Sequence, residues 1–439
     1  MSLKPRQRCA DARSVGMRLR DNAAWVGLAA ACAAPICWLG LGRFQWNDYA
    51  REALPAVDAL VHGHLSGFFA LAPAYGGALL ERAPFALVPG LWDGGEFAVY
   101  RMLAAPCLLA VTALGLWLAA RMRRDGLGHY ARVLALALCA ANPLALTALE
   151  SGHPEELLGG ALCVAAVLLA ARARPAWAGL ALGLAVVNKE WALLALGPVL
   201  LALPSRRILC VSVAGGVGAT LLAPFALSAP GAFGSGVRLA ASPSGAIFLP
   251  SQLWWFLGKS AHDGYRVAPG WVGPVSHPLI VALAGPLTLA AWLHTRHMAR
   301  GAETLVANVR THICACEADA LLLLALLLAL RFMLDPWDNA YYPVPFVLAL
   351  ATWEALARRR APVLALTVTA AVWAAQHSVA PYASADAQAA FFAAWNVPLV
   401  VGLALALYSP GRSPALPSRR REPVPTPKGP LARATMNAP

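Results

Sequence analysis

Short clusters of basic residues, separated by long apolar stretches, constrain this chain more than any other feature. Of its 35 Lys and Arg residues, 26 lie in seven clusters. The positive-inside rule places such clusters on the cytoplasmic side of a membrane. Because the apolar stretches can be paired into outgoing and returning spans, one topology puts every cluster on that side. The clusters lie at the N-terminus, in 121–132, 172–174, 206–207, 296–310 and 358–360, and after 410.

The composition excludes an ordinary soluble domain. The 439 residues are 59% hydrophobic and only 13% charged, whereas soluble domains carry about 25% charged residues. The formal charge of +13 would also suit a nucleic-acid-binding protein, but the basic residues form no continuous face with interleaved aromatic residues. We therefore expect an integral membrane protein whose basic loops contact anionic membrane lipids, with no nucleic-acid partner.

The apolar stretches predict an all-α, polytopic bundle of transmembrane helices. A helix needs about 20 residues to cross a bilayer. The stretch 176–203 is flanked by Arg and carries Lys189 and Glu190 in its middle, so we predict a hairpin of two short helices with its turn outside. The whole chain then has about twelve membrane segments and two cytoplasmic termini. The other predicted spans are 24–42, 97–120, 131–149, 155–171, 208–228, 277–294, 318–334, 341–357, 361–376 and 390–409.

This topology divides the chain into three parts. Residues 1–22 are a basic cytoplasmic N-terminus, 23–409 a transmembrane domain, and 410–439 a disordered cytoplasmic tail rich in Pro, Arg and Ser. Two outer loops are long enough to hold a site. The first, 43–96, is interrupted by prolines and predicts short helices that lie along the membrane surface or dip into it. The second, 229–276, contains Trp254, Trp255 and Trp271 and is expected to rest at the membrane interface.

The segment directly after the first span contains the candidate catalytic residue. Asp48 lies at the predicted outer mouth of the membrane, close in sequence to Arg43, Tyr49 and Glu52. A carboxylate in that position can act as a general base toward a hydroxyl group while a neighbouring cation holds a phosphate leaving group. The alternative is a solvated Asp that caps a helix beside an interfacial aromatic residue.

Three further polar turns are predicted to reach the same side of the membrane. They are 150–156, 188–190 and 331–343. Ionisable residues at membrane depth are costly and are usually paired or functional. Lys189 and Glu190 can also form a purely structural pair, and Arg331 can be an arginine that snorkels from a helix end. The candidate substrate-binding residues in these turns are His153, Glu155, Glu156, Lys189, Glu190, Arg331, Tyr341 and Tyr342.

The order of these features resembles the GT-C superfamily of membrane glycosyltransferases, and glycosyltransferase family 87 in particular. The features are an acid just after the first span, a Gly-His turn at 152–153, Ala178-Gly179 followed by Lys189, and an Arg before Tyr341-Tyr342-x-x-Pro345. The resemblance covers most of the membrane region. Gly-His-Pro-Glu-Glu at 152–156 departs from the Gly-Gln-x-Asn that is commoner in the family, which leaves the sugar and the acceptor open.

The resemblance implies a GT-C-like fold with helical extracytoplasmic loops and a glycosyltransferase in the plasma membrane with an extracytoplasmic site. A sugar, expected to be mannose, would pass from a polyprenyl-phosphate donor to a glycan or lipid-linked acceptor with inversion, and Asp48 would be the base. Arg or Lys can hold the leaving phosphate, so the reaction requires no cofactor. Whether a divalent metal takes part is left open. The alternatives are a multi-span permease or lipid flippase, or another membrane transferase such as a polysaccharide ligase.

Overall fold

A computed structural model describes residues 5–42, 48–241, 247–261, 265–303, 309–337, 340–379 and 381–409. Side chains are described in 22–42, 48–241, 247–261, 265–297, 316–337, 340–377 and 381–409. Arg43 and the tail 410–439 therefore lie outside the described residues. Within these ranges the regular structure is almost entirely helical, as the sequence predicts.

The elements follow one another from α1 to α17. They are α1 (Pro5–Gly42), η1 (Tyr49–Ala53), α2 (Leu54–Val61), α3 (Leu65–Leu71), α4 (Gly76–Ala86), η2 (Val88–Trp92), α5 (Glu96–Arg124), α6 (His129–Ala140), α7 (Pro143–Ser151), α8 (Glu155–Ala171), α9 (Pro175–Asn188), η3 (Glu190–Ala195), α10 (Leu196–Ala202), α11 (Arg207–Ser228), α12 (Pro230–Ala241), β1 (Ile247–Phe248), η4 (Leu253–Leu257), β2 (Lys259–Ser260), β3 (Arg266–Val267), α13 (Val272–Glu303), α14 (Val309–Leu334), α15 (Val344–Leu356), α16 (Val363–Ala374), η6 (Ala375–Val379) and α17 (Ala385–Tyr408).

Every predicted span contains a helix. Among the described residues, six helical segments are long and apolar enough to cross a membrane, and four shorter apolar helices accompany them. The predicted span 131–149 is divided into α6 and α7 at Asn142-Pro143, because Pro143 has no N–H to continue the ladder of α6. The Asn142 side chain caps α7 by accepting from the Leu144 N–H at 2.9 Å. The chain is thus an all-α membrane protein, and the total of about twelve segments stays a prediction.

The hairpin predicted in 176–203 is present. A Cβ atom added at Gly179 would lie 2.4 Å from the Cys210 carbonyl oxygen, and one at Gly183 would lie 2.8 Å from that of Ala214. The contact positions advance together along both helices, so α9 and α11 run in the same direction. The chain between them, η3 and α10, must therefore return, and Lys189 lies at the reversal. The two glycines form a Gly-x-x-x-Gly pattern, which lets membrane helices approach closely.

The two outer loops differ from each other in structure. The first is helical, as predicted, but Pro84 lies inside α4 and does not interrupt it. The second contains α12, η4 and a small antiparallel sheet of order β1-β3-β2, so the prediction of purely helical loops was wrong there. Trp254 and Trp255 are buried, and only Trp271 is exposed as the interfacial prediction requires. The indole N–H groups of Trp254 and Trp255 donate to Leu334 O and to Asp386, respectively.

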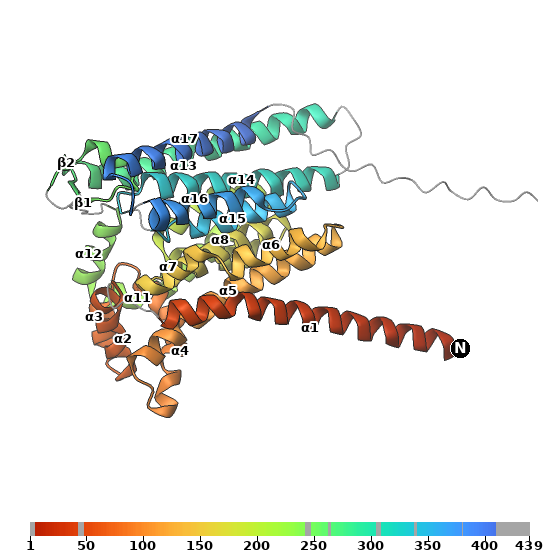
Figure 1. Cartoon of the computed structure of the whole chain (residues 1–439), viewed down its shortest axis with the longest axis horizontal. Coiled ribbons are helices and arrows are strands. Elements are labelled where there is room, and N and C mark those ends of the chain that lie inside the picture. The colour runs from red at the N-terminus through yellow and green to blue at the C-terminus, as the bar shows by residue number, and fades with distance from the viewer. Residues whose placement is uncertain are drawn as a thin grey trace, which may run out of the picture.

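The outer-loop elements gather at one end of the bundle. Figure 1 shows α2, α3, α12 and the strands at the end where α1 finishes, opposite the N-terminus of the chain. α14 and α15 form the buried centre, where residues 320–334 and 344–355 are almost completely enclosed. Only 11–22% of the spanning windows of α1, α11, α13 and α17 is buried inside the protein, and their surfaces are apolar, as lipid contact requires.

The close approach of α9 and α11 makes a stability prediction. Gly179→Val should force the two helices apart and lower the free energy of unfolding by about 1–3 kcal/mol, the usual cost of overpacking. The thermal midpoint of the purified protein in detergent measures this. Gly215→Val is the matched control, since a Cβ at Gly215 in α11 meets nothing within 4 Å. Equal midpoints for the two variants would contradict the packing.

Candidate functional site

Asp48 and His153 lie in contact at the end of the bundle where α1 finishes (Figure 1). His153 Nε2 is 3.4 Å from Asp48 Oδ2, and His153 Nδ1 is 2.7 Å from Glu155 Oε1. Both neighbours are carboxylates that only accept hydrogen bonds, so the ring donates from both nitrogens and is an imidazolium. The His153 side chain is 5% exposed, whereas that of Asp48 is 41% exposed. A substrate can therefore reach Asp48 but not its partner.

The two groups stabilise each other's charged form. The hydrogen bond from His153 lowers the pKa of Asp48 below its ordinary value, with further help from the charges of His153, Arg51 and Lys189. Burial alone would lower the pKa of His153, but the Glu155 carboxylate and the hydrogen bonds with Asp48 and Glu155 outweigh it and raise that pKa to about 9. Asp48 is thus a carboxylate and His153 a cation at neutral pH.

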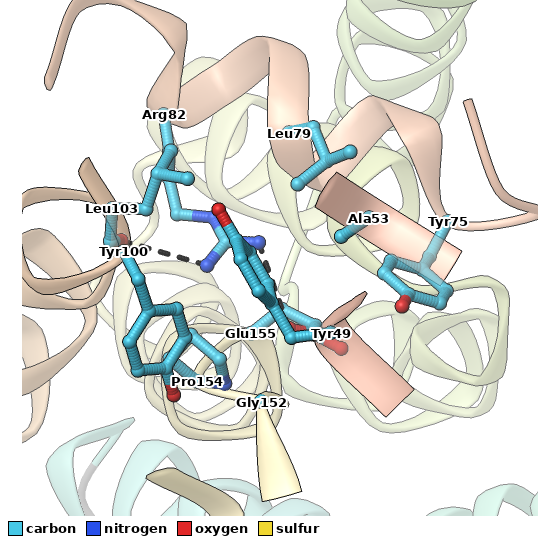
Figure 2. A pocket seen from close by; sticks show the side chains of 10 residues that line it. All are labelled: Tyr49, Ala53, Tyr75, Leu79, Arg82, Tyr100, Leu103, Gly152, Pro154 and Glu155. Carbon is cyan, nitrogen blue, oxygen red and sulfur yellow. Dashed lines mark hydrogen bonds and ion pairs between the residues drawn. The ribbon is translucent and has the colours of Figure 1, made fainter. Parts of the chain in front are cut away.

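A glycine allows the segment that carries Asp48 to approach the turn that carries His153. Gly152 ends α7 with φ +90°, and an added Cβ would lie 2.5 Å from Tyr49 Cβ. The neighbouring Tyr49 ring packs edge-on against Tyr100 at 4.9 Å, and the Tyr100 hydroxyl donates to Leu149 O. Figure 2 shows these rings and Gly152 around a narrow space that the lining side chains almost fill. The aromatic pair fixes η1 against the end of α7.

Glu155 is a buried carboxylate that three cations surround. Its Oε1 accepts from His153 and from Lys189 Nζ at 3.2 Å, while its Oε2 lies 3.5 Å from Arg82 Nη2. Arg82 also donates to Ala78 O at 2.8 Å and to Leu103 O at 3.5 Å, which fixes its side chain between α4 and α5. The approach of Arg82 toward Glu155 is visible in Figure 2. Arg82 was not predicted as a site residue. Its position outside the seven basic clusters was a signal that it lies away from the cytoplasmic side, on the side where the site was expected.

Glu156 forms a two-pronged ion pair with Arg331. Both guanidinium Nη atoms lie 3.0 Å from a Glu156 oxygen, and Trp191 Nε1 donates to Oε1 at 3.1 Å. The guanidinium lies between the rings of Trp191 and Tyr342, 4.7 Å and 4.3 Å from their centroids. Arg331 is thus already paired and its side chain is only 5% exposed. Its predicted role as a substrate ligand stays a prediction, and the geometry favours a positioning role.

Three tyrosines surround the ionic cluster. The Tyr341 ring stacks on His153 with 4.9 Å between centroids, and Tyr342 packs against Tyr341 at 5.2 Å. Tyr75 meets His153 edge-on at 5.7 Å, carries Lys189 Nζ 4.1 Å above its ring, and donates to Glu52 Oε2 at 2.7 Å. Tyr75 was missed in the sequence, where a single Tyr before Gly76-Gly77 gave no distinctive pattern.

The structure thus brings together nearly all the predicted site residues from four segments of chain. Glu190 is the exception, since within the described residues no hydrogen bond or ion pair joins it to the cluster. Arg43 is outside the described residues. No group of three His, Cys, Asp or Glu side chains with metal-binding geometry occurs in the described part. The residues joined here are Asp48, Tyr49, Glu52, His153, Glu155, Glu156, Lys189, Arg331, Tyr341 and Tyr342.

The bridging imidazolium predicts a pH-dependent contribution to stability. A folded pKa of about 9 lies above the ordinary 6.5. The stabilisation by protonated His153, on the order of 3 kcal/mol, should therefore be complete below about pH 6.5 and be lost as the pH rises through about 9. Thermal midpoints of the wild type and His153→Gln should differ at pH 6.5 and converge near pH 10. A difference that does not change with pH would refute the charged bridge.

Comparison with known proteins gives one match. The family described as Glycosyltransferase family 87 matches residues 76–316. This range contains Arg82, His153, Glu155, Glu156 and Lys189, and Asp48 and Arg331 lie outside it. No curated protein and no solved structure matches the chain. Because the match covers more than half of the sequence, this membrane protein belongs to glycosyltransferase family 87.

Proposed function

We propose that this glycosyltransferase moves a sugar, expected to be mannose, from a polyprenyl-phosphate donor to an extracytoplasmic glycan or lipid-linked acceptor. The observation that carries the proposal is the half-exposed Asp48 carboxylate, oriented by a buried imidazolium, beside a cluster that is rich in cations. The active site is proposed to face outward in the plasma membrane with both termini in the cytoplasm, because this topology keeps the basic clusters inside.

Asp48 is proposed to act as the general base of an inverting displacement. Its carboxylate takes the proton of an acceptor hydroxyl, the oxygen attacks the anomeric carbon, and the bond from that carbon to the phosphate oxygen breaks. The sugar ends on the acceptor, the proton on Asp48, and the polyprenyl phosphate leaves. His153 holds Asp48 ionised and fixes its orientation. The lowered pKa makes Asp48 a weak base, which suffices when the transition state is oxocarbenium-like and the nucleophile is deprotonated late.

Lys189 is proposed to hold the leaving phosphate. Four cations (Arg82, His153, Lys189 and Arg331) face two fully buried carboxylates, Glu155 and Glu156. Lys189 is more exposed than Arg82 and Arg331, at 12% of its side chain against 3% and 5%. An ammonium group stabilises a phosphate as negative charge develops on it. The rings of Tyr75, Tyr341 and Tyr342 would pack against the sugar or the lipid.

The donor is tested directly by transfer assays. Purified protein is incubated with polyprenyl-phosphate mannose, glucose or arabinose and with glycans and glycolipids extracted from cell envelopes, and the glycosylated product is identified by mass spectrometry. The proposal requires transfer from at least one polyprenyl-phosphate sugar and inversion at the anomeric carbon. Transfer from a nucleotide sugar alone would contradict it.

Asp48→Asn should reduce transfer by about 10²–10⁴-fold, the usual contribution of a general base, while the protein stays folded. The turnover number of detergent-purified protein measures this. Asp58→Asn is the matched control, because Asp58 lies in the same outer loop, is exposed, and pairs only with the neighbouring His62 among the contacts described. Retained transfer in Asp48→Asn, or an equal loss in both variants, would remove Asp48 from the base role.

A further inference from the structure

His277 forms a second bridge outside the site described above. Its Nδ1 lies 2.6 Å from the carbonyl oxygen of Ala240 in the last turn of α12, and its Nε2 lies 3.2 Å from Asp335 Oδ2 at the end of α14. Both partners are acceptors, so this ring also donates from both nitrogens. His277 thereby ties the second outer loop to the end of α14.

Trp254 makes a second contact at the same place. Its indole N–H donates to the Leu334 carbonyl oxygen at 2.7 Å, and the side chain is buried. A carbonyl in the last turn of a helix lacks its intrahelical partner, and Trp254 supplies one. The other Asp335 oxygen, Oδ1, accepts from the Trp337 N–H at 2.9 Å. Trp254 of the second outer loop thus holds Leu334, and His277 at the start of α13 holds the next residue, Asp335.

The last turn of α14 carries Arg331. The Asp335 N–H donates to the Arg331 carbonyl oxygen at 2.9 Å, and the Arg331 side chain holds Glu156 and donates to Tyr342 O at 3.4 Å. A displacement of this turn would therefore move the guanidinium, and with it Glu156 and Tyr342, which packs against the Tyr341 ring that stacks on His153. Neither His277 nor Trp254 contacts Asp48, His153 or Lys189 in any hydrogen bond described here.

We propose that His277 and Trp254 are positioning residues that clamp the last turn of α14 and so hold Arg331 and Tyr342 in place for sugar transfer. The predicted effect of the clamp on turnover rests on the proposed function. Its effect on the order of the last turn of α14 can be tested separately. The ionisable groups that act on His277 are Asp335 and, at a greater distance, Glu190 of η3. Arg238 of α12 donates to Ser235 Oγ at 2.9 Å.

The test compares three clamp variants with one control. His277→Ala removes both contacts, His277→Gln keeps a donor that can reach Asp335, and Trp254→Phe removes only the contact with Leu334. His297→Ala is the control, because His297 lies on the same helix, is exposed, and is separated from His277 by about 30 Å of helix. Amide hydrogen exchange of residues 331–337, kcat and the KM for the donor are measured on monodisperse full-length protein.

We expect faster exchange of 331–337 in His277→Ala and Trp254→Phe, with no change in His297→Ala. The kcat of both variants should fall about tenfold to a hundredfold, as for a small misplacement of site residues, while the KM for the donor stays within about threefold because Lys189 is untouched. His277→Gln should recover part of both losses.

Unchanged exchange of 331–337 in His277→Ala would overturn the clamp, as would faster exchange with wild-type kcat. A loss of kcat without faster exchange would also overturn it, since it would mean that His277 acts directly on the substrate. If the wild type transfers no sugar from any polyprenyl-phosphate donor, the proposed function fails, and the exchange measurements still decide whether the clamp exists.

Discussion

The site depends on the burial of two adjacent carboxylates, Glu155 and Glu156, at the start of α8. Both are fully enclosed by protein, where an uncompensated charge costs several kcal/mol. The N-terminus of α8 offsets part of this cost, because the helix dipole favours negative charge there. The remainder requires cations, and they come from α4, the turn before α8, the turn after α9, and α14. The need to neutralise two charges thus holds distant segments of the chain at one point.

The two carboxylates have different partners and different consequences. Glu155 faces His153, Lys189 and Arg82, and its charge keeps His153 protonated beside Asp48. Glu156 faces Arg331 and Trp191 and connects α8 to the end of α14. Glu155 therefore sets the protonation of His153, next to the proposed chemistry, and Glu156 fixes α8 against α14. Removing a single cation would leave a buried charge unpaired, which is more damaging than removing a whole ion pair.

Sequence reasoning predicted the helices and the convergence of the polar turns, because both follow from simple constraints. Basic clusters fix which turns share a side of the membrane, and the interrupted apolar stretch 176–203 required a reversal at Lys189. The sequence could not show that Arg82 reaches Glu155, since this depends on Gly76 and Gly77 letting α4 pack closely against α9 and α11. It also could not distinguish an Arg331 that binds substrate from one that holds Glu156, because both roles need the same residue at the same depth. The small sheet in the second outer loop has strands of only two residues, too short for an alternating pattern to appear.

Asp48 and Lys189 are proposed to act on opposite sides of one anomeric carbon: Asp48 activates the acceptor hydroxyl that attacks it, and Lys189 holds the phosphate that leaves it. A cryo-electron microscopy structure with a non-transferable polyprenyl-phosphate sugar analogue tests this most directly. We expect the phosphate within hydrogen-bonding distance of Lys189 Nζ, and Asp48 facing the side of the anomeric carbon opposite the phosphate. A donor bound with its phosphate away from Lys189, or with Asp48 on the same side as the leaving group, would contradict this proposal.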